Sequence, residues 1–226
     1  MSTLVIAEKK EVGEAIANAF SKMLNIPIQK KNGVNYVGGF TITALAGHVM
    51  KLKEWEEIDP ELKKWTLERL PIYFDNWEKI PEKNNDFKMN KFNTAKALLK
   101  ECDDVIHAGD VDDEGQSLVD EVLEYCKNKK PVKRILISDT NADNIIKQYK
   151  KMESNDKYLL LGKAAYARNM ADNVFGKNLT RFFTLKNDRA MVNVGRVKIP
   201  TLGFVVERDL EIENFVKKHY LNINAV

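Results

Sequence analysis

The sequence predicts an α/β fold in which a mostly parallel sheet is followed by a smaller all-helical region. Short apolar runs at 3–8, 104–110 and 132–138 have the length and composition of buried strands. Segments with helical periodicity separate these runs, and such alternation is typical of an open parallel sheet. Two longer helical patterns follow, at 157–179 and 199–215, and no strand-like run lies between them.

In chain order, the first expected elements are a strand, a helix and a hairpin. The strand at 3–8 leads into 10–24, where apolar residues recur at helical spacing. Residues 35–47 carry two adjacent glycines between β-prone runs, which favours a hairpin. The segment 51–88 is irregular, but it contains all three tryptophans, so we expect a packed excursion rather than a linker.

The following elements alternate regularly. Helical patterns occupy 89–102, 114–126 and 141–152, with the two later strands between them. The strand signal ends after residue 154. We therefore expect an α/β domain over 1–153 and a helical region over 154–215.

Composition limits the class of protein. The 226 residues are 44% hydrophobic with a net charge of +3, so the chain can bury a substantial core and is not a bulk polycation. A local basic face for nucleic acid is neither required nor excluded. Cys102 and Cys126 lack a CxxC spacing, which indicates a reduced compartment and argues against structural zinc. Without a secretory pattern or an apolar run of about 18 residues, we expect a soluble cytoplasmic protein with no membrane span.

An acidic turn follows the strand at 104–110. Asp110 and Asp112 fall at the carboxyl end of a parallel strand, where open α/β sheets bind their ligands, and Glu114 enters from the next helix. Three carboxylates at this spacing suit Mg²⁺, which binds few protein oxygens and keeps several waters. In the alternative interpretation, Asp112 and Asp113 favour the start of the helix through its macrodipole and Asp110 caps it.

Glu8 and Lys9 follow the first strand in the same way. The carboxyl ends of parallel strands share one edge, so this pair is expected beside Asp110. A carboxyl group that transfers protons and a cation that stabilises developing charge suit phosphoryl chemistry. Ordinary helix-start surface is the alternative.

These two segments resemble a known family. The stretches LVIAEKKEVGEAIA and VIHAGDVDDEGQSLVDEVL are similar to the Toprim domain of type IA DNA topoisomerases, closest to the topoisomerase III branch. The Toprim signature is a Glu after the first strand and Asp-x-Asp-x-Glu after a later one. Here these residues are Glu8, Asp110, Asp112 and Glu114.

Three further blocks resemble topoisomerase III in the expected order. They lie at 47–77, beginning GHVMKLKEW, at 167–184, reading ARNMADNVFGKNLTRFFT, and at 194–215, beginning VGRVKIPTL. Together with the Toprim stretches, these three blocks cover nearly the whole chain. The resemblance therefore implies the N-terminal part of a type IA DNA topoisomerase, an isomerase, with a Toprim (Rossmann-like) domain and a helical DNA-binding region.

The resemblance implies a mechanism. A tyrosine attacks a phosphodiester in single-stranded DNA and becomes linked to the 5′ phosphate, the other strand passes, and the break is resealed without ATP. The chain has no GxxxxGK[ST] loop, in agreement with a reaction without ATP. Asp110, Asp112 and Glu114 are expected to hold Mg²⁺, Glu8 to shuttle a proton at the leaving 3′ oxygen, and Lys9 to stabilise the developing charge.

The resemblance also places a groove for single-stranded DNA in the helical region. Its expected DNA-binding residues are Arg168, Asp172, Asn178, Thr180, Arg181, Arg196 and Lys198. Arg168 and Asp172 share one helix face, and Gly176 is expected to end that helix before Asn178. In the alternative interpretation, Arg168 and Asp172 form only a weak pair on the surface. For Arg196 the alternative is a surface charge at the start of a helix.

The chain departs from the family in three places, and at one of them Lys198-Ile199 stand where Gln-Thr is common. Asp113 stands where an Arg is usual, which reverses the charge beside the expected metal. None of the seven tyrosines has the Tyr-Pro-Arg-Thr-like setting of the nucleophile. We therefore expect a fragment that does not cleave DNA alone, in which 216–226 begins a truncated β arch domain, and whose partners include the remaining domains with the active Tyr.

Two other functions are compatible with parts of the pattern. A metal-dependent Toprim nuclease or primase-like enzyme would be complete within this length, although the blocks after residue 166 argue against it. A non-catalytic module that binds single-stranded DNA is favoured by Asp113 and by the missing tyrosine. The sequence leaves the oligomeric state open.

Overall fold

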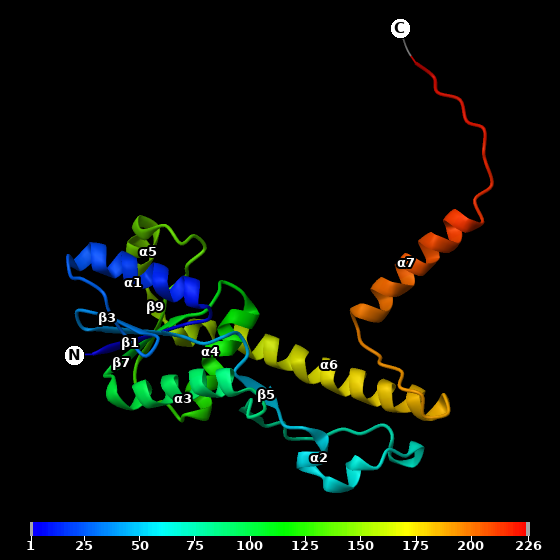
Figure 1. The fold of residues 1–226 in the computed structure, drawn as a ribbon, viewed down its shortest axis with the longest axis horizontal. Helices are drawn as coiled ribbons and strands as arrows, with labels where there is room; N and C mark the ends of the chain where they lie inside the picture. Colours follow the sequence, from blue (N-terminus) through cyan, green and yellow to red (C-terminus); the bar gives the residue numbers. More distant parts are fainter. Residues whose placement is uncertain (1, 225–226) are drawn as a thin grey trace. The chain divides into compact units, whose positions relative to one another are not determined.

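The computed structural model describes residues 2–224, which form two compact units (Figure 1). The first unit runs to Lys63 and resumes from Phe74 to Met170, and the second consists of Lys64–Tyr73 and the chain from Ala171 onward. The first unit contains the sheets and their helices. The predicted order, a mixed and mostly parallel α/β domain followed by helices, is confirmed.

The main sheet has seven strands in the order β2-β3-β4-β1-β7-β8-β9. The four central strands are parallel, whereas β2, β3 and β9 pair antiparallel at the two edges. The strands are β1 (Thr3–Ala7), β2 (Gln29–Lys31), β3 (Val34–Val37), β4 (Phe40–Ala44), β7 (Asp104–Ala108), β8 (Val132–Arg134) and β9 (Glu153–Ser154). A separate antiparallel pair is formed by β5 (Met50–Leu52) and β6 (Lys79–Pro81).

Helices cover both faces of the main sheet (Figure 1). One face carries α1 (Lys10–Leu24) and α5 (Ala142–Tyr149), and the other carries α3 (Asp86–Glu101) and α4 (Asp113–Tyr125). The remaining helical elements are α2 (Trp55–Ile58), η1 (Pro60–Lys63), η2 (Leu67–Arg69), η3 (Asn155–Tyr158), α6 (Leu159–Lys186) and α7 (Lys198–Glu213).

The central strand β1 is apolar on both of its faces. Leu4 and Ile6 pack in the core under α3 and α4, whereas Val5 and Ala7 pack in the core under α1 and α5. All four side chains are fully buried. Burying a Val, Leu or Ile side chain contributes roughly 1.5–3 kcal/mol, so a strand with three such positions belongs at the centre of the sheet.

The expected hairpin is present between β3 and β4, with Val37 paired to Phe40. Gly38 lies in the turn with φ of 57°, a conformation that glycine adopts without steric cost. The expected packed excursion is also confirmed, because Trp55 is fully buried and its ring lies 5.9 Å from Phe74.

The strand connections diverge at the carboxyl ends of β1 and β7, and this edge of the sheet is called the crevice below. These strands are neighbours, with Ala7 paired to Ala108. The helix that follows β1 covers one face of the sheet, and the helix that follows β7 covers the other. Adjacent strands whose connections part in this way form a topological switch point, the usual ligand site of open α/β sheets.

Two local predictions are wrong. Gly176 does not end a helix, because α6 continues through it to Lys186 and is 28 residues long. The strand predicted at 132–138 stops at Arg134, which is buried. Tertiary packing overrides local propensity at both places.

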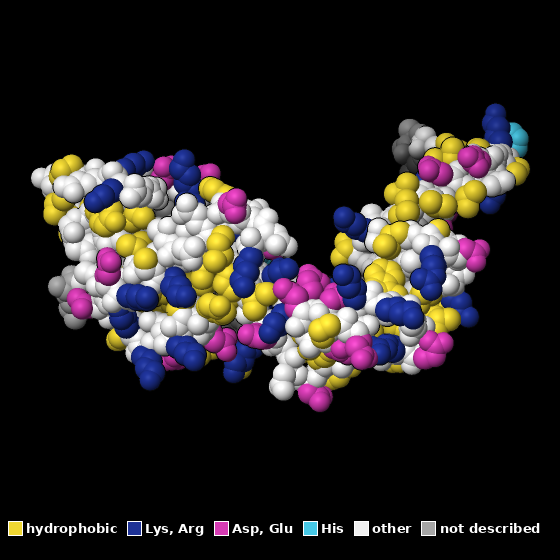
Figure 2. Space-filling view, turned by 60° about the horizontal axis from the view of Figure 1, so that its bottom comes forward, with side chains coloured by type: hydrophobic (Ala, Val, Ile, Leu, Met, Phe, Trp, Pro, Cys, Tyr) yellow, Lys and Arg dark blue, Asp and Glu magenta, His cyan; other side chains and the backbone are white. Residues whose placement is uncertain are grey.

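α7 differs from every helix of the sheet domain, because none of its residues is buried within the described part of the chain. Hydrophobic side chains lie along its surface, among them Leu202, Phe204, Val205 and Leu210 (Figure 2). The residues after it, 215–224, contain neither helix nor strand. No helix in the described range is both long and apolar enough to cross a membrane.

Candidate metal and DNA site

Glu8, Lys9 and Asp110 meet in the crevice between β1 and β7. The Lys9 ammonium lies 2.5 Å from Asp110 Oδ2 and 3.3 Å from Glu8 Oε1. The Asp110 backbone N–H donates to Glu8 Oε2 at 3.2 Å. The hydrogen bond to Asp110, and then the charge of Glu8, raise the pKa of Lys9, so its charge is secure at neutral pH. The predicted juxtaposition of the two strand ends is confirmed.

Asp112 starts helix α4. Its side-chain Oδ1 accepts the backbone N–H of Gly115 at 2.6 Å, which satisfies one of the donors left unpaired at a helix N-terminus. The alternative interpretation assigned this cap to Asp110, whose side chain instead pairs with Lys9. The cap and the expected metal ligand are thus the same residue at position 112.

The glycines that frame the turn are required by close backbone packing. A Cβ at Gly109 would lie 2.1 Å from the carbonyl oxygen of Gly115, and a Cβ at Gly115 would lie 2.5 Å from the backbone nitrogen of Asp110. Any larger residue at either position must displace main chain. The two glycines therefore let the acidic turn fold back onto the first turn of α4.

Arg168 and His48 contact the rest of the acidic turn. Arg168, from α6, donates to Asp113 Oδ2 at 2.5 Å and to Glu114 Oε2 at 2.8 Å. His48 Nε2 lies 2.8 Å from the other Glu114 oxygen. The hydrogen bond from Arg168 lowers the pKa of Asp113, and the same contacts raise the pKa of Arg168. The reversed charge at position 113 thus has a cationic partner within the same unit.

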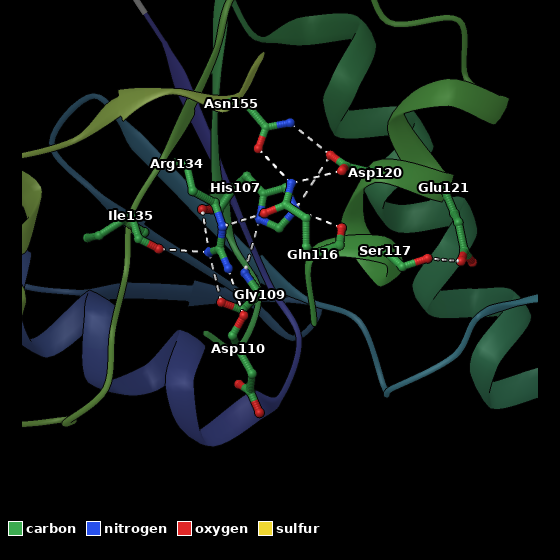
Figure 3. Close-up of polar contacts among 10 residues, drawn as sticks. All are labelled: His107, Gly109, Asp110, Gln116, Ser117, Asp120, Glu121, Arg134, Ile135 and Asn155. Atoms are coloured by element: carbon green, nitrogen blue, oxygen red, sulfur yellow. Dashed lines mark hydrogen bonds and ion pairs between the residues drawn. The ribbon is translucent and has the colours of Figure 1, made fainter. Parts of the chain in front are cut away.

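A buried polar network lies under the turn, and sequence patterns alone did not indicate it as part of the site (Figure 3). Arg134 Nε donates to Gln116 Oε1 at 2.8 Å, and Gln116 Nε2 donates to Asp120 and Asn155, both at 2.8 Å. His107 Nε2 lies 3.1 Å from the carbonyl oxygen of Gln116. The signal that could have found Arg134 is its place directly before the apolar residues Ile135, Leu136 and Ile137.

Burial sets the charge states in this network. It lowers the pKa of His107 to about 3, with a further contribution from the Arg134 charge, so His107 is neutral at physiological pH. Burial also lowers the pKa of Arg134 to about 10, which leaves the guanidinium charged. Desolvation raises the pKa of Asp120. His107 is a core residue, as its place on a buried strand predicts, rather than a ligand.

The donor chemistry of the turn fits Mg²⁺. Asp110, Asp112 and Glu114 offer hard carboxylate oxygens at the ligand edge of the sheet. Within residues 2–224, no three His, Cys, Asp or Glu side chains are grouped closely enough to hold a metal. Instead Lys9 contacts Asp110 and Arg168 contacts Glu114. The assignment of these three residues to a metal stays a prediction.

Asp172 and Arg196 form a two-pronged ion pair in the second unit. Arg196 Nε lies 2.6 Å from Asp172 Oδ1, and a terminal guanidinium nitrogen lies 3.0 Å from Oδ2. Both side chains are exposed. Two parallel N–H···O bonds fix the guanidinium plane, which is the geometry that also binds phosphate. Lys198, the first residue of α7, is exposed two positions later.

Asn178, Thr180 and Arg181 contact protein groups within the second unit. Asn178 pairs with both backbone groups of Ile72, at 2.7 and 2.8 Å, and the Thr180 hydroxyl accepts the backbone N–H of Val194 at 2.9 Å. Arg181 is buried, and its guanidinium lies 5.2 Å from the centre of the Trp65 ring. Their predicted contacts with DNA are not tested by this arrangement.

Comparison with known families divides the chain into two parts. Residues 3–140, more than half of the chain, match the Toprim domain family, and residues 156–226 match the DNA topoisomerase family. The chain also shares its fold with the full-length topoisomerase I from Thermotoga maritima, with a TM-score of 0.58 and 21% identity. That match covers 94% of this chain and 31% of the other.

Relatives match over the whole chain. DNA topoisomerase 3 from Vibrio cholerae is 38% identical across 100% of this chain and 35% of its own length. DNA topoisomerase 3 from Staphylococcus epidermidis is 36% identical across 100% of this chain and 31% of its own length. The chain spans about a third of the length of these relatives. With a Toprim domain followed by the DNA topoisomerase segment, the chain belongs to the type IA DNA topoisomerases, among the topoisomerase III homologues.

Proposed function

We propose that this chain acts in a type IA DNA topoisomerase that cleaves, passes and rejoins single-stranded DNA through a 5′-phosphotyrosine link, with Mg²⁺ and without ATP. The observation that supports this most is the meeting of Glu8, Lys9 and Asp110 at the switch point. The chain supplies the metal-binding and DNA-binding groups. The nucleophilic tyrosine comes from the part of the protein that corresponds to the remaining two thirds of its relatives.

The crevice residues have distinct roles in this reaction. Asp110, Asp112 and Glu114 hold Mg²⁺, which when bound neutralises charge on the scissile phosphate. Glu8 is buried, and it exchanges a proton with the leaving 3′ oxygen. Lys9 is about half exposed, so its ammonium can turn from Asp110 toward the phosphate and stabilise the pentavalent transition state.

The helical region binds the single strand through exposed cations. Arg168, Arg196 and Lys198 contact backbone phosphates, and Asp172 orients Arg196. Asn178, Thr180 and Arg181 hold the segments around Ile72, Val194 and Trp65 that line the strand's path. These contacts do not read bases, so binding is insensitive to sequence.

The proposed division of labour follows the expected domains. Residues 1–153 form the Toprim domain and 154–215 the DNA-binding region of a cytoplasmic enzyme. Residues 216–226 begin the β arch domain. Of the residues in these three parts, Met1, Ala225 and Val226 lie outside the described residues.

Titration with Mg²⁺ by calorimetry tests the metal site. The wild-type chain should bind one or two ions, and the double variant Asp110→Ala/Asp112→Ala should bind none. The matched control is Glu207→Ala/Asp209→Ala, which removes two exposed acidic residues of α7. Binding that is equal in both double variants, or absent in the wild type, contradicts the assignment.

A cleavage assay separates the topoisomerase from a Toprim nuclease. The chain should bind single-stranded DNA with an affinity that falls steeply with salt, and it should leave the strand uncut in Mg²⁺. Cleaved DNA from this chain alone would contradict the proposal and favour the nuclease. DNA binding that is identical with and without Mg²⁺ would instead favour a non-catalytic binding module.

A further inference from the structure

Arg134 lies buried directly beneath the acidic turn, with only 2% of its surface exposed (Figure 3). One terminal nitrogen donates to the carbonyl oxygens of Gly109 at 2.8 Å and Ile135 at 2.7 Å, and it also lies 3.3 Å from that of His107. The other donates to the carbonyl oxygen of Asp110 at 2.6 Å. Its Nε reaches Gln116, in the first turns of α4. The guanidinium therefore ties β7, the turn and α4 together.

The partners of this cation are unusual. Every hydrogen bond found for Arg134 among residues 2–224 goes to an uncharged oxygen. Burying a charge without a contacting counter-ion is costly, and an apolar residue of similar size often stabilises such a position equally well. The stability of the fold therefore gives a weak reason for an arginine here. The position of the backbone groups that Arg134 contacts gives a stronger reason.

Two of the carbonyl groups, those of Gly109 and Asp110, belong to the two peptide groups that flank the Asp110 α-carbon. When these two carbonyl groups are held, the backbone that carries the Asp110 side chain is held as well. Gln116 extends the same restraint to the helix that Asp112 caps. The negative charge of Asp120, and to a smaller extent those of Asp110 and Asp112, stabilise the buried cation.

We propose that Arg134 is the positioning residue of the acidic turn: its planar fork fixes the main chain from Gly109 to Asp110 and so aims the Asp110 and Asp112 carboxylates into the crevice. The part of this inference that concerns Mg²⁺ rests on the proposed function. The part that concerns the order of the turn does not. Lysine cannot replace Arg134, because a single ammonium has three donors and no fork.

Amide hydrogen exchange tests the positioning directly. Arg134→Lys retains the charge, and Arg134→Met retains the approximate volume. In both, amides at 109–115 should exchange about tenfold faster or more, because the turn loses several hydrogen bonds, while the amides of β1 keep their protection. Lys133→Met is the matched control, since Lys133 is the exposed neighbour on the same strand. It should leave exchange in the turn unchanged.

Magnesium calorimetry on the same proteins tests the consequence. The Arg134→Lys variant should bind Mg²⁺ at least tenfold more weakly than the wild type at a temperature where both are folded by near-UV circular dichroism. A wild-type chain that binds no Mg²⁺ would overturn the proposed metal site, and the exchange experiment would then decide on Arg134 by itself.

Three results would overturn the positioning role. Unchanged exchange at 109–115 in both Arg134 variants would show that the turn is held without the fork. Loss of protection across the whole sheet in both variants would make Arg134 a general stability residue. If the wild type binds Mg²⁺ and Arg134→Lys binds it with the same affinity, the guanidinium does not determine the position of the carboxylates.

Discussion

Phe20 and Phe204 show how differently the sheet domain and helix α7 treat the same residue. Phe20 in α1 is fully buried, with its ring 4.5 Å from Phe40 and 5.0 Å from Tyr149. Phe204 in α7 is 72% exposed. Both lie in helices with apolar residues at helical spacing. Periodicity therefore identifies a face that can be buried, whereas the sheet next to α1 decides that it is buried.

The charged pairs of the two regions differ in the same way. Lys79 and Glu121, on β6 and α4, form an ion pair that is more than nine-tenths buried, and Ser117 donates its hydroxyl to Glu121 at 2.5 Å. Arg208 and Glu211 pair at 2.8 Å on α7, where both side chains are about two-thirds exposed. The low-dielectric interior strengthens the first pair and makes the loss of one partner costly.

The largest contrast is expected for the two phenylalanines. Phe20→Ala should destabilise the sheet domain by about 3–5 kcal/mol, because it leaves a cavity among packed rings. Phe204→Ala should change stability by less than about 0.5 kcal/mol. Urea unfolding of both variants measures the difference. Similar losses in the two would mean that Phe204 is buried in solution, and the comparison would fail.

The ion pairs should differ somewhat less. Lys79→Met leaves the buried Glu121 carboxylate without its cation and should cost about 3 kcal/mol. Arg208→Gln should cost at most about 0.5 kcal/mol. The midpoint of urea unfolding at pH 7 distinguishes them. A cost below about 1 kcal/mol for Lys79→Met would indicate that Glu121 takes up a proton or reaches solvent.

The same glycine-to-alanine change should have opposite signs in the two regions. Gly115→Ala forces backbone apart at the acidic turn and should cost roughly 1–3 kcal/mol in unfolding experiments. Gly203 lies inside α7, where no neighbouring atom of the described residues comes within 4 Å of the place that a Cβ would occupy. Gly203→Ala should stabilise the helix by about 1 kcal/mol, seen as roughly fivefold slower amide exchange in α7. Destabilisation by Gly203→Ala would show that α7 packs closely in solution.

A further effect, spread over several pH units, is the pH dependence contributed by buried His107. Its pKa is lowered by burial, and then by the Arg134 charge, from 6.5 to about 3. Between these values the unfolded chain binds a proton that the folded chain does not, so stability falls as pH decreases through this window. The slope is at most about 1.4 kcal/mol per pH unit.

His107→Gln should remove this contribution and flatten the profile of unfolding free energy between pH 6.5 and 4. His219→Gln, in the exposed segment after α7, controls for the loss of a histidine. Equal slopes for wild type and His107→Gln would mean that His107 is accessible to protons in the folded state.

Sequence patterns were sufficient to predict the order of helices and strands in the sheet domain and the meeting of Glu8 and Asp110 at one edge of the sheet. The run at 3–8 had to be central, because β1 is apolar at every position after Thr3 and needs cover on both faces. Glu8 and Asp110 could be brought together from sequence, because parallel strands end at a common edge. The domain boundaries and the individual ligand and DNA contacts remain predictions.

Tertiary structure decided which polar groups compensate one another. The spacing of Arg168 and Asp172 on one helix face indicated a local pair, whereas Arg168 contacts Asp113 and Glu114, which lie 55 and 54 positions away. The strand pattern at 132–138 did not indicate that Arg134 lies beneath the acidic turn. Periodicity records how much of a segment is apolar and on which side. It carries no information on distant partners, because those contacts exist only after the sheet and helices have packed.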